Sequence, residues 1–273
     1  MKDSGLLDLS QVSLACVESR RHPLAIAAMQ RCMRQARFAE CVLLSPTAPA
    51  LPPGIGHVPI PEIVGIEGYS DFMVRRLGDC FAASHVLVVQ WDGFVLDAAC
   101  WDPAFLDYDY IGAPWNDPQR SVGNGGFSLR SRRLCEALRE LAPAKTHPED
   151  VCISKDLRPQ LEARGIRFAP TAVAERFAWE EPQPPFPTFG FHGLFNFHRA
   201  LPEAELVAFL HDCDDGILFS VPARRLFKRC LAAGMTDAAR TIRERRMAGP
   251  PGMRLDVLKL EAFAVAKRWT GRG

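Results

Sequence analysis

The strongest constraint on the fold of this chain is a short run of aliphatic residues in its first half. Val86 to Val89 are four consecutive aliphatic residues, and Gln90, Trp91 and Asp92 follow them directly. An uninterrupted apolar run, unlike an alternating one, is typical of a strand that is covered on both faces. In open α/β sheets, ligands bind at the carboxyl ends of strands. The run therefore predicts a buried strand that delivers Gln90, Trp91 and Asp92 to a ligand site.

The residues before this strand predict more of the same sheet. Residues 11–17 and 41–44 read as strands, and residues 23–38 between them have helical spacing with Pro23 in the first turn. A β-α-β opening of this kind favours a parallel sheet. A further helix is predicted from Ser70, as its cap, to about residue 81, and it leads into the strand at 85–92.

The polar residues Glu18 to Arg21 follow the first predicted strand. At the carboxyl end of a strand they are candidates for a nucleotide pocket, and they are equally consistent with a solvated loop.

A glycine-rich segment follows the central strand, with Gly123, Gly125 and Gly126 just before residues 127–130. Glycines at this spacing permit positive φ and a close approach of the backbone to a ligand. The segment is neither a P-loop nor a dinucleotide-binding fingerprint, because no Lys-Ser/Thr follows and the third glycine of G-x-G-x-x-G is absent. Ser131 then predicts the cap of another helix.

Thr146 and Glu149 have the spacing of a capping box, which would give Glu149 a purely structural role. Asp150 is not needed for that box. It is a candidate catalytic carboxylate, and it is equally consistent with an acid that the helix dipole favours in a first turn. This helix is predicted to end at Gly165, and residues 166–169 to form a short strand.

Strand signals fade after about residue 200. We therefore predict a first domain over residues 1–200 and a helical extension over residues 201–273. The predicted helices of the extension span residues 206–211, 223–233, 237–247 and 255–267.

Composition limits the function classes. The formal net charge of +1 gives no overall field that would attract nucleic acid, and no apolar run reaches the length of about 20 residues that a membrane span needs. The nine cysteines are an odd number without a C-x-x-C pair, which favours reduced thiols and a cytoplasmic protein.

Five motifs stand out along the chain: Gln90-Trp-Asp92, Tyr108-Asp-Tyr-Ile-Gly-Ala-Pro-Trp115, Val122-Gly-Asn-Gly-Gly-Phe-Ser-Leu-Arg130, Glu149-Asp150 and Phe191-His-Gly193. Together they resemble a bacterial group of glycosyltransferase-like proteins. The resemblance covers about residues 12–197, and it extends more distantly to the β-1,3-galactosyltransferase and Fringe type of GT-A enzyme. It implies an α/β, GT-A-like, mostly parallel sheet flanked by helices.

The resemblance also implies roles for particular residues. Asp92 matches the metal-binding aspartate of a D-x-D motif, with Gln90 in place of the first aspartate, and His192 matches a late metal ligand. Asp150 matches the catalytic base, and Gly125 and Gly126 match the glycine pair beside the sugars. The residues expected around donor and acceptor are Glu18, Arg20, Gln90, Trp91, Trp115, Asn124, Gly125, Gly126 and Glu149.

These features predict a glycosyltransferase that moves a sugar from a nucleotide-diphosphate sugar to a saccharide or another hydroxyl acceptor. A carboxylate and an imidazole suit Mn²⁺ or Mg²⁺ held partly by phosphate oxygens. The distant resemblance favours inversion at the anomeric carbon. Two alternatives stay open: a non-catalytic saccharide-binding or scaffold protein, which Gln90 and the helical extension suggest, and a nucleotidyltransferase. The extension is a candidate surface for a protein partner.

Overall fold

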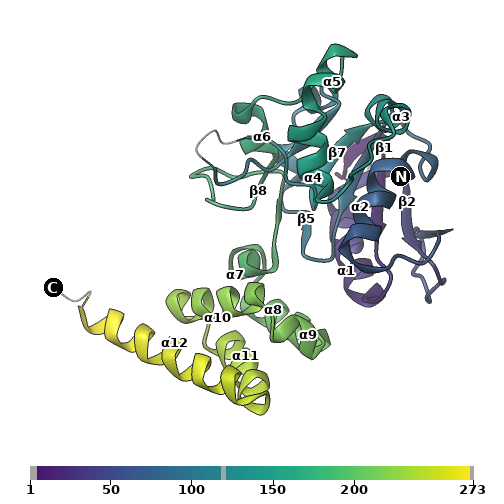
Figure 1. Cartoon of the computed structure of the whole chain (residues 1–273). Helices are drawn as coiled ribbons and strands as arrows, with labels where there is room; N and C mark the ends of the chain where they lie inside the picture. Colours follow the sequence, from purple (N-terminus) through teal and green to yellow (C-terminus); the bar gives the residue numbers. More distant parts are fainter. Residues whose placement is uncertain (1–4, 118–120, 271–273) are drawn as a thin grey trace. The chain divides into compact units, whose positions relative to one another are not determined.

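The computed structural model describes residues 5–117 and 121–270, and it divides the chain into two compact units, Met1–His192 and Gly193–Gly273. The first unit is α/β and the second is helical (Figure 1). The predicted α/β class, with a mostly parallel sheet flanked by helices and a helical C-terminal region, is confirmed. The domain boundary at residue 200 stays a prediction.

The main sheet has six strands in the order β3-β2-β1-β4-β7-β6. The first four are mutually parallel, and β7 runs antiparallel to both β4 and β6. The central position of β4 agrees with its apolar sequence. The strands are β1 (Leu7–Val17), β2 (Ala36–Ser45), β3 (Gly56–Pro59), β4 (His85–Val89), β6 (Tyr110–Gly112) and β7 (Phe127–Ser131).

Both faces of β4 are covered. Val86 and Val88 belong to a buried cluster with Phe72 and Met73 of helix α2 (Gly65–Arg75). Leu87 and Val89 point to the opposite face, because side chains alternate along a strand, and they are fully buried as well. After His85, β4 has no polar side chain, and Gln90 directly follows its last residue.

The first unit also contains a second, small sheet. It has the strand order β5-β9-β8, and it places His192 directly opposite Gly93. The remaining elements of the first unit are helices α1 (His22–Gln35), α3 (Arg132–Leu141), α4 (Glu149–Val151), α5 (Arg158–Ala163) and α6 (Thr171–Phe177), and strands β5 (Gly93–Val95), β8 (Ala178–Trp179) and β9 (Gly190–His192).

Several predicted boundaries were wrong. Helix α2 begins at Gly65 without a side-chain cap, so Ser70 lies inside it, and residues 77–79 form a separate 3₁₀ turn. Strand β2 begins at Ala36, inside the predicted first helix. The stretch predicted as a strand at residues 166–169 makes only an isolated bridge from Phe168 to Tyr110.

The predicted capping box was also wrong. Pro148 is the N-cap of α4, and no side chain caps the helix. A π-helical turn, Cys152–Asp156, then separates α4 from α5. Ser131, by contrast, is the N-cap of α3 as predicted, because its hydroxyl accepts a hydrogen bond from Leu134 N at 3.0 Å.

The second unit consists of short helices followed by three longer ones. Ser220 caps α10 through Ala223 N, and Gly234 ends that helix in the left-handed region at φ 74°. Within the described residues, no helix is long and apolar enough to cross a membrane. The helices are α7 (Phe197–Ala200), α8 (Glu203–Asp212), α9 (Asp215–Leu218), α10 (Val221–Ala233), α11 (Thr236–Ala248) and α12 (Pro251–Thr270).

Candidate functional site

A cavity of about 510 Å³ lies at the carboxyl ends of β1 and β4. This is the edge of a parallel sheet where ligands bind in open α/β folds. The loop after β1, the glycine segment before β7, the first half of α2 and the start of α4 form its walls, and His192 of β9 lines it as well. All of these elements belong to the first unit.

Glu18 shapes the loop after β1. Its carboxylate Oε1 accepts hydrogen bonds from the backbone N–H groups of Arg20, at 2.8 Å, and Arg21, at 3.1 Å. Glu18 thus holds the turn that presents both arginines to the cavity. The guanidinium of Arg21 also lies 6.0 Å from the ring centre of Trp91, which follows β4. Two cations therefore line the cavity beside the end of the central strand.

The glycine segment is held closely against neighbouring side chains. Asn124 Oδ1 accepts a hydrogen bond from Gly126 N at 3.1 Å, and Asn124 Nδ2 donates to Glu180 Oε2 at 3.1 Å. A Cβ at Gly125 would overlap the carboxylate of Glu149, and one at Gly126 would overlap the imidazole of His192. Neither glycine has a positive φ, so the close approach of neighbouring groups, and not left-handed backbone, is the reason for glycine here. These two positions require glycine because there is no room for a side chain.

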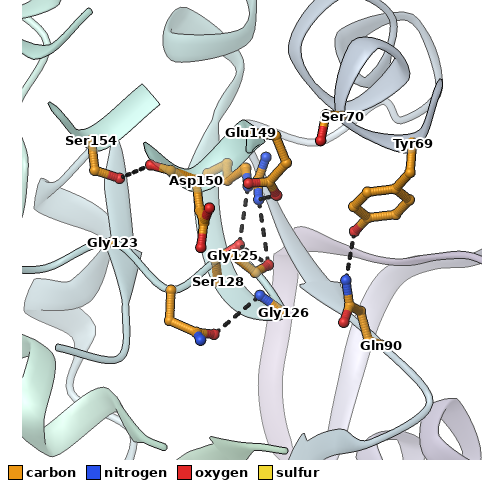
Figure 2. Close-up of polar contacts among 12 residues, drawn as sticks. Tyr69, Ser70, Gln90, Gly123, Gly125, Gly126, Ser128, Glu149, Asp150 and Ser154 are labelled. Carbon is orange, nitrogen blue, oxygen red and sulfur yellow. Dashed lines mark hydrogen bonds and ion pairs between the residues drawn. The ribbon is translucent and has the colours of Figure 1, made fainter. Parts of the chain in front are cut away.

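Beneath this segment lies a buried ion pair. Arg130 Nη2 donates to Glu149 Oε1 at 2.7 Å, and the two side chains are only 1% and 7% exposed. Arg130 also donates to Gly125 O at 3.3 Å and to Ser128 Oγ at 3.0 Å. Arg130 therefore ties the glycine segment to the start of α4. Figure 2 shows Glu149 and Asp150 next to the segment that carries Gly123, Gly125 and Gly126.

Asp150 is the neighbouring carboxylate, and it lines the cavity. Its Oδ1 accepts a hydrogen bond from Val151 N at 2.9 Å. Burial raises the pKa of Asp150, and the negative charge of Glu149 raises it further. A carboxylate with a raised pKa is a better proton acceptor than an ordinary surface aspartate.

His192 lies at the centre of a polar cluster. Its Nε2 lies 3.3 Å from Asp92 Oδ1 and 3.2 Å from Gln90 Oε1, and its Nδ1 lies 3.2 Å from Glu180 Oε1. Burial lowers the pKa of His192, but Asp92 and Glu180 outweigh this effect and raise it to about 10. The structure thus brings the two predicted metal ligands together.

The donor set of this cluster fits a divalent cation in part. His192 Nε2 lies close to both Asp92 Oδ1 and Gln90 Oε1, and Glu180 takes the orienting position on Nδ1 that carboxylates occupy behind metal-bound histidines. A cation would have to displace the proton from Nε2. Among residues 5–117 and 121–270, no group of three or more His, Cys, Asp or Glu side chains could hold a metal ion. The protein could therefore supply only part of a coordination shell.

One protein family, described as a protein of unknown function (DUF5672), matches residues 56–192, half of the chain. The chain belongs to the DUF5672 family. The matched segment runs from β3 to β9, so it contains the glycine segment, Asp150 and His192, whereas Glu18 and Arg20 lie outside it. A search of curated protein sequences found no match to this DUF5672 chain.

Three solved structures are similar to the DUF5672 chain at low identity. The galactosyltransferase LgtC, in complex with donor and acceptor sugar analogues, is 12% identical over 66% of this chain and 86% of its own, with a TM-score of 0.38. The mannosyltransferase PcManGT from Pyrobaculum calidifontis, in complex with GDP-Man and Mn²⁺, is 11% identical over 99% and 86%, with a TM-score of 0.40. The apo-form glycosyltransferase GlyE of Streptococcus pneumoniae is 12% identical over 66% and 53%, with a TM-score of 0.42. With TM-scores below 0.5, these likenesses do not assign a function to the DUF5672 chain.

Most of the residues predicted for the site of this DUF5672 protein lie around one cavity. Two do not line it. The ring of Trp115 packs against Gly123, and its centre lies 4.5 Å from Lys155 Nζ. Asp92 contacts His192, which lines the cavity. The residues that line the cavity are Glu18, Arg20, Gln90, Trp91, Asn124, Gly125, Gly126, Glu149, Asp150 and His192.

Sequence reasoning missed other residues of the DUF5672 cavity. Tyr69 accepts a hydrogen bond from Gln90 Nε2 at 2.9 Å, and Ser70 Oγ lies 2.9 Å from His147 Nδ1 (Figure 2 shows Tyr69, Ser70 and Gln90). Tyr69, Ser70 and His147 all line the cavity. Tyr69 and Ser70 were missed because the helix was predicted to begin at Ser70, whereas α2 begins at Gly65 and both residues lie inside it. Glu180 and Arg130 act through contacts distant in sequence, which no local motif signals.

Proposed function

We propose that this chain is a glycosyltransferase that moves a sugar from a nucleoside-diphosphate sugar to a hydroxyl of a saccharide or another acceptor. One observation carries the proposal: a single cavity is lined by a carboxylate of raised pKa, Asp150, and by the cations of Arg20, Arg21 and His192. Sugar transfer needs both, because a proton leaves the acceptor hydroxyl while negative charge builds on the departing diphosphate.

The loop after β1 and the end of β4 form the donor half of the site in this proposal. Arg20 and Arg21 would pair with the diphosphate, since guanidinium groups bind phosphate oxygens with two parallel hydrogen bonds. Trp91 offers an aromatic face beside Arg21. Gly125 and Gly126 would let the sugar approach the backbone, although their first neighbours are the protein's own side chains, Glu149 and His192.

A divalent cation, when bound by Asp92, His192 and the amide oxygen of Gln90, would supply charge neutralisation for the diphosphate. Glu180 would orient His192 through Nδ1. Without such a cation, His192 carries a proton at neutral pH, and its positive charge would face the diphosphate. Mn²⁺ and Mg²⁺ are the cations that this donor set favours.

Asp150 would act as the base. Its carboxylate accepts the proton of the acceptor hydroxyl as that oxygen attacks the anomeric carbon, and the bond from that carbon to the diphosphate breaks. General-base catalysis typically contributes about 10²–10⁴-fold in rate. The distant resemblance to inverting enzymes favours inversion. Nine free cysteines suit the reducing cytoplasm as the place of this reaction.

The test is a thermal-shift screen of nucleoside-diphosphate sugars, with and without Mn²⁺, followed by mass spectrometry of the sugar products. A donor at 100 times its dissociation constant stabilises the protein by about 2.7 kcal/mol. Donor binding with sugar transfer, or with slow donor hydrolysis, supports the proposal. Binding without turnover, and no change on Asp150→Asn, would indicate a saccharide-binding protein. Consumption of nucleoside triphosphate with release of pyrophosphate would indicate a nucleotidyltransferase.

A further inference from the structure

Helix α12 in the second unit has two contrasting faces along residues 251–262, the part of the helix whose side chains the structure describes. Val257 and Leu260 are buried at 0% and 6% exposure. Figure 1 shows α12 beside α10 and α11, the helices that it contacts. Leu255 and Leu258, three residues apart and therefore neighbours on the helix surface, are 59% and 50% exposed. The helix thus docks by one face and presents leucines on the other.

The acidic residues of this segment all belong to the docked face. Asp256 pairs with Arg224 at 2.7 Å and with Arg246 at 2.9 Å, and Glu261 pairs with Arg243 at 2.8 Å. These ion pairs tie α12 to α10 and α11. They also remove the negative charges of residues 251–262 from the outer face.

The outer face carries cations beside its leucines. Lys259 lies one turn after Leu255, and Arg254 lies one turn before Leu258, and both are exposed. At 100° per residue, Arg254 and Lys259 fall on opposite edges of the leucine stripe. From Gly193 onward the sequence also has more Arg and Lys than Asp and Glu residues. An apolar stripe between two cations is the pattern of a helix that lies in the interface of an anionic membrane, with the long cationic side chains reaching the headgroups.

We infer that the outer face of α12, formed by Arg254, Leu255, Leu258 and Lys259, binds the surface of a membrane that contains anionic lipids. Charge complementarity favours an anionic membrane surface over other partners, because the exposed charges of residues 251–262 are cationic. The helix would lie on the membrane and would not cross it. The inference concerns the helical unit and does not depend on the activity proposed for the cavity.

The test is co-sedimentation of the full chain with vesicles of phosphatidylcholine, alone or mixed with phosphatidylglycerol. We expect binding to the mixed vesicles, little binding to phosphatidylcholine alone, and release as the salt concentration rises from about 0.1 M to 1 M, which shortens the screening length from about 10 Å to 3 Å. Arg254→Gln with Lys259→Gln should weaken binding about fivefold per cation. Leu255→Gln with Leu258→Gln should weaken it by more than about tenfold.

Two matched double variants serve as controls. Leu6→Gln with Phe186→Gln removes two exposed apolar side chains of the first unit, and Arg37→Gln with Arg139→Gln removes two exposed cations there. Both should bind vesicles as the wild type does. Circular dichroism and melting temperature should be unchanged in the α12 variants, because the altered side chains are exposed.

Three results would overturn the inference. One is a wild-type chain that does not sediment with the anionic vesicles, and another is equal binding by the leucine variants. The third is a wild-type dimer in sedimentation velocity that the leucine variants abolish without any vesicle binding, which would assign the face to a second copy of the chain.

Discussion

The buried pair of Arg130 and Glu149 should contribute far more to stability than an exposed ion pair of the same chemistry. Removing one partner of a buried pair leaves the other charge without compensation, which typically costs about 3–5 kcal/mol. Arg130→Met leaves Glu149 in this state at 7% exposure. Gly125 O loses one donor but keeps the hydroxyl of Ser128 at 3.0 Å, so the cost arises mainly from the carboxylate.

The assay is urea unfolding followed by tryptophan fluorescence. Four of the five tryptophans lie in Met1–His192, so the signal reports mainly on the unit that contains the pair. With an m-value of about 3 kcal/mol/M, a loss of 3–5 kcal/mol lowers the midpoint by roughly 1–2 M. Glu149→Gln should also be costly, in contrast to the mild effect that a capping-box role would predict.

Two variants make this reasoning refutable. Arg139→Met breaks an exposed pair with Asp79, with side chains 58% and 46% exposed, and should cost at most about 1 kcal/mol. Arg130→Met combined with Glu149→Met replaces the whole pair by apolar groups and should recover most of the loss. If Arg130→Met costs no more than Arg139→Met, or if the double variant is worse than both single variants, the pair does not carry the stability assigned to it.

Three further predictions concern the cavity. Asp150→Asn should lower sugar transfer by about 10²-fold or more with donor affinity near that of the wild type. Because burial raises the folded-state pKa of Asp150, the ionised form is disfavoured in the folded protein, so this variant should also be the more stable one at neutral pH. That advantage should shrink in urea unfolding as the pH falls through the raised pKa. Asp92→Asn should abolish, and His192→Ala should weaken, the Mn²⁺ dependence of donor binding without unfolding the chain; unchanged metal titrations in both would remove the metal site. Gly126→Val should abolish activity and lower the melting temperature, because its side chain meets His192, and a fully active variant would place the sugar elsewhere.

Much of the fold was predictable because its strongest elements are encoded locally. The aliphatic run of β4 indicates burial on both faces, and the caps at Ser131 and Gly234 lie in the same few residues as the helix ends that they define. The boundaries that failed depend on long-range contacts. Ser70 has the chemistry of a cap, but its hydroxyl is engaged by His147, 77 residues away. Strands β5, β8 and β9 have two or three residues each, too few to show a period.

The candidate site was predictable to the same extent. Asp150 and His192 stand in recognisable motifs, whereas the contacts that hold them in place cannot be read from those motifs. Glu180 orients His192 across 12 residues of sequence, and Arg130 reaches Glu149 across 19. Such pairs form only when β7, α4 and β9 come together. The sequence therefore indicates the candidate catalytic and metal-binding residues, but not the partners that position them.

The consecutive residues Glu149 and Asp150 show how a buried contact of one residue affects the direction and the pKa of the next. Successive residues of a helix point about 100° apart, so a helix that turns one acid into the protein presents the next one in another direction. Glu149 is turned in and held by Arg130, while Asp150 remains on the cavity wall, and Ser154 Oγ donates to Asp150 O at 2.6 Å. Glu149 therefore fixes the rotation of α4 about its axis, and this rotation fixes the direction of Asp150. Burial is the main cause of the raised pKa of Asp150, and the charge of Glu149 raises it further, although Arg130 opposes that effect. Glu149 thus fixes the direction of Asp150 and contributes to its proton affinity.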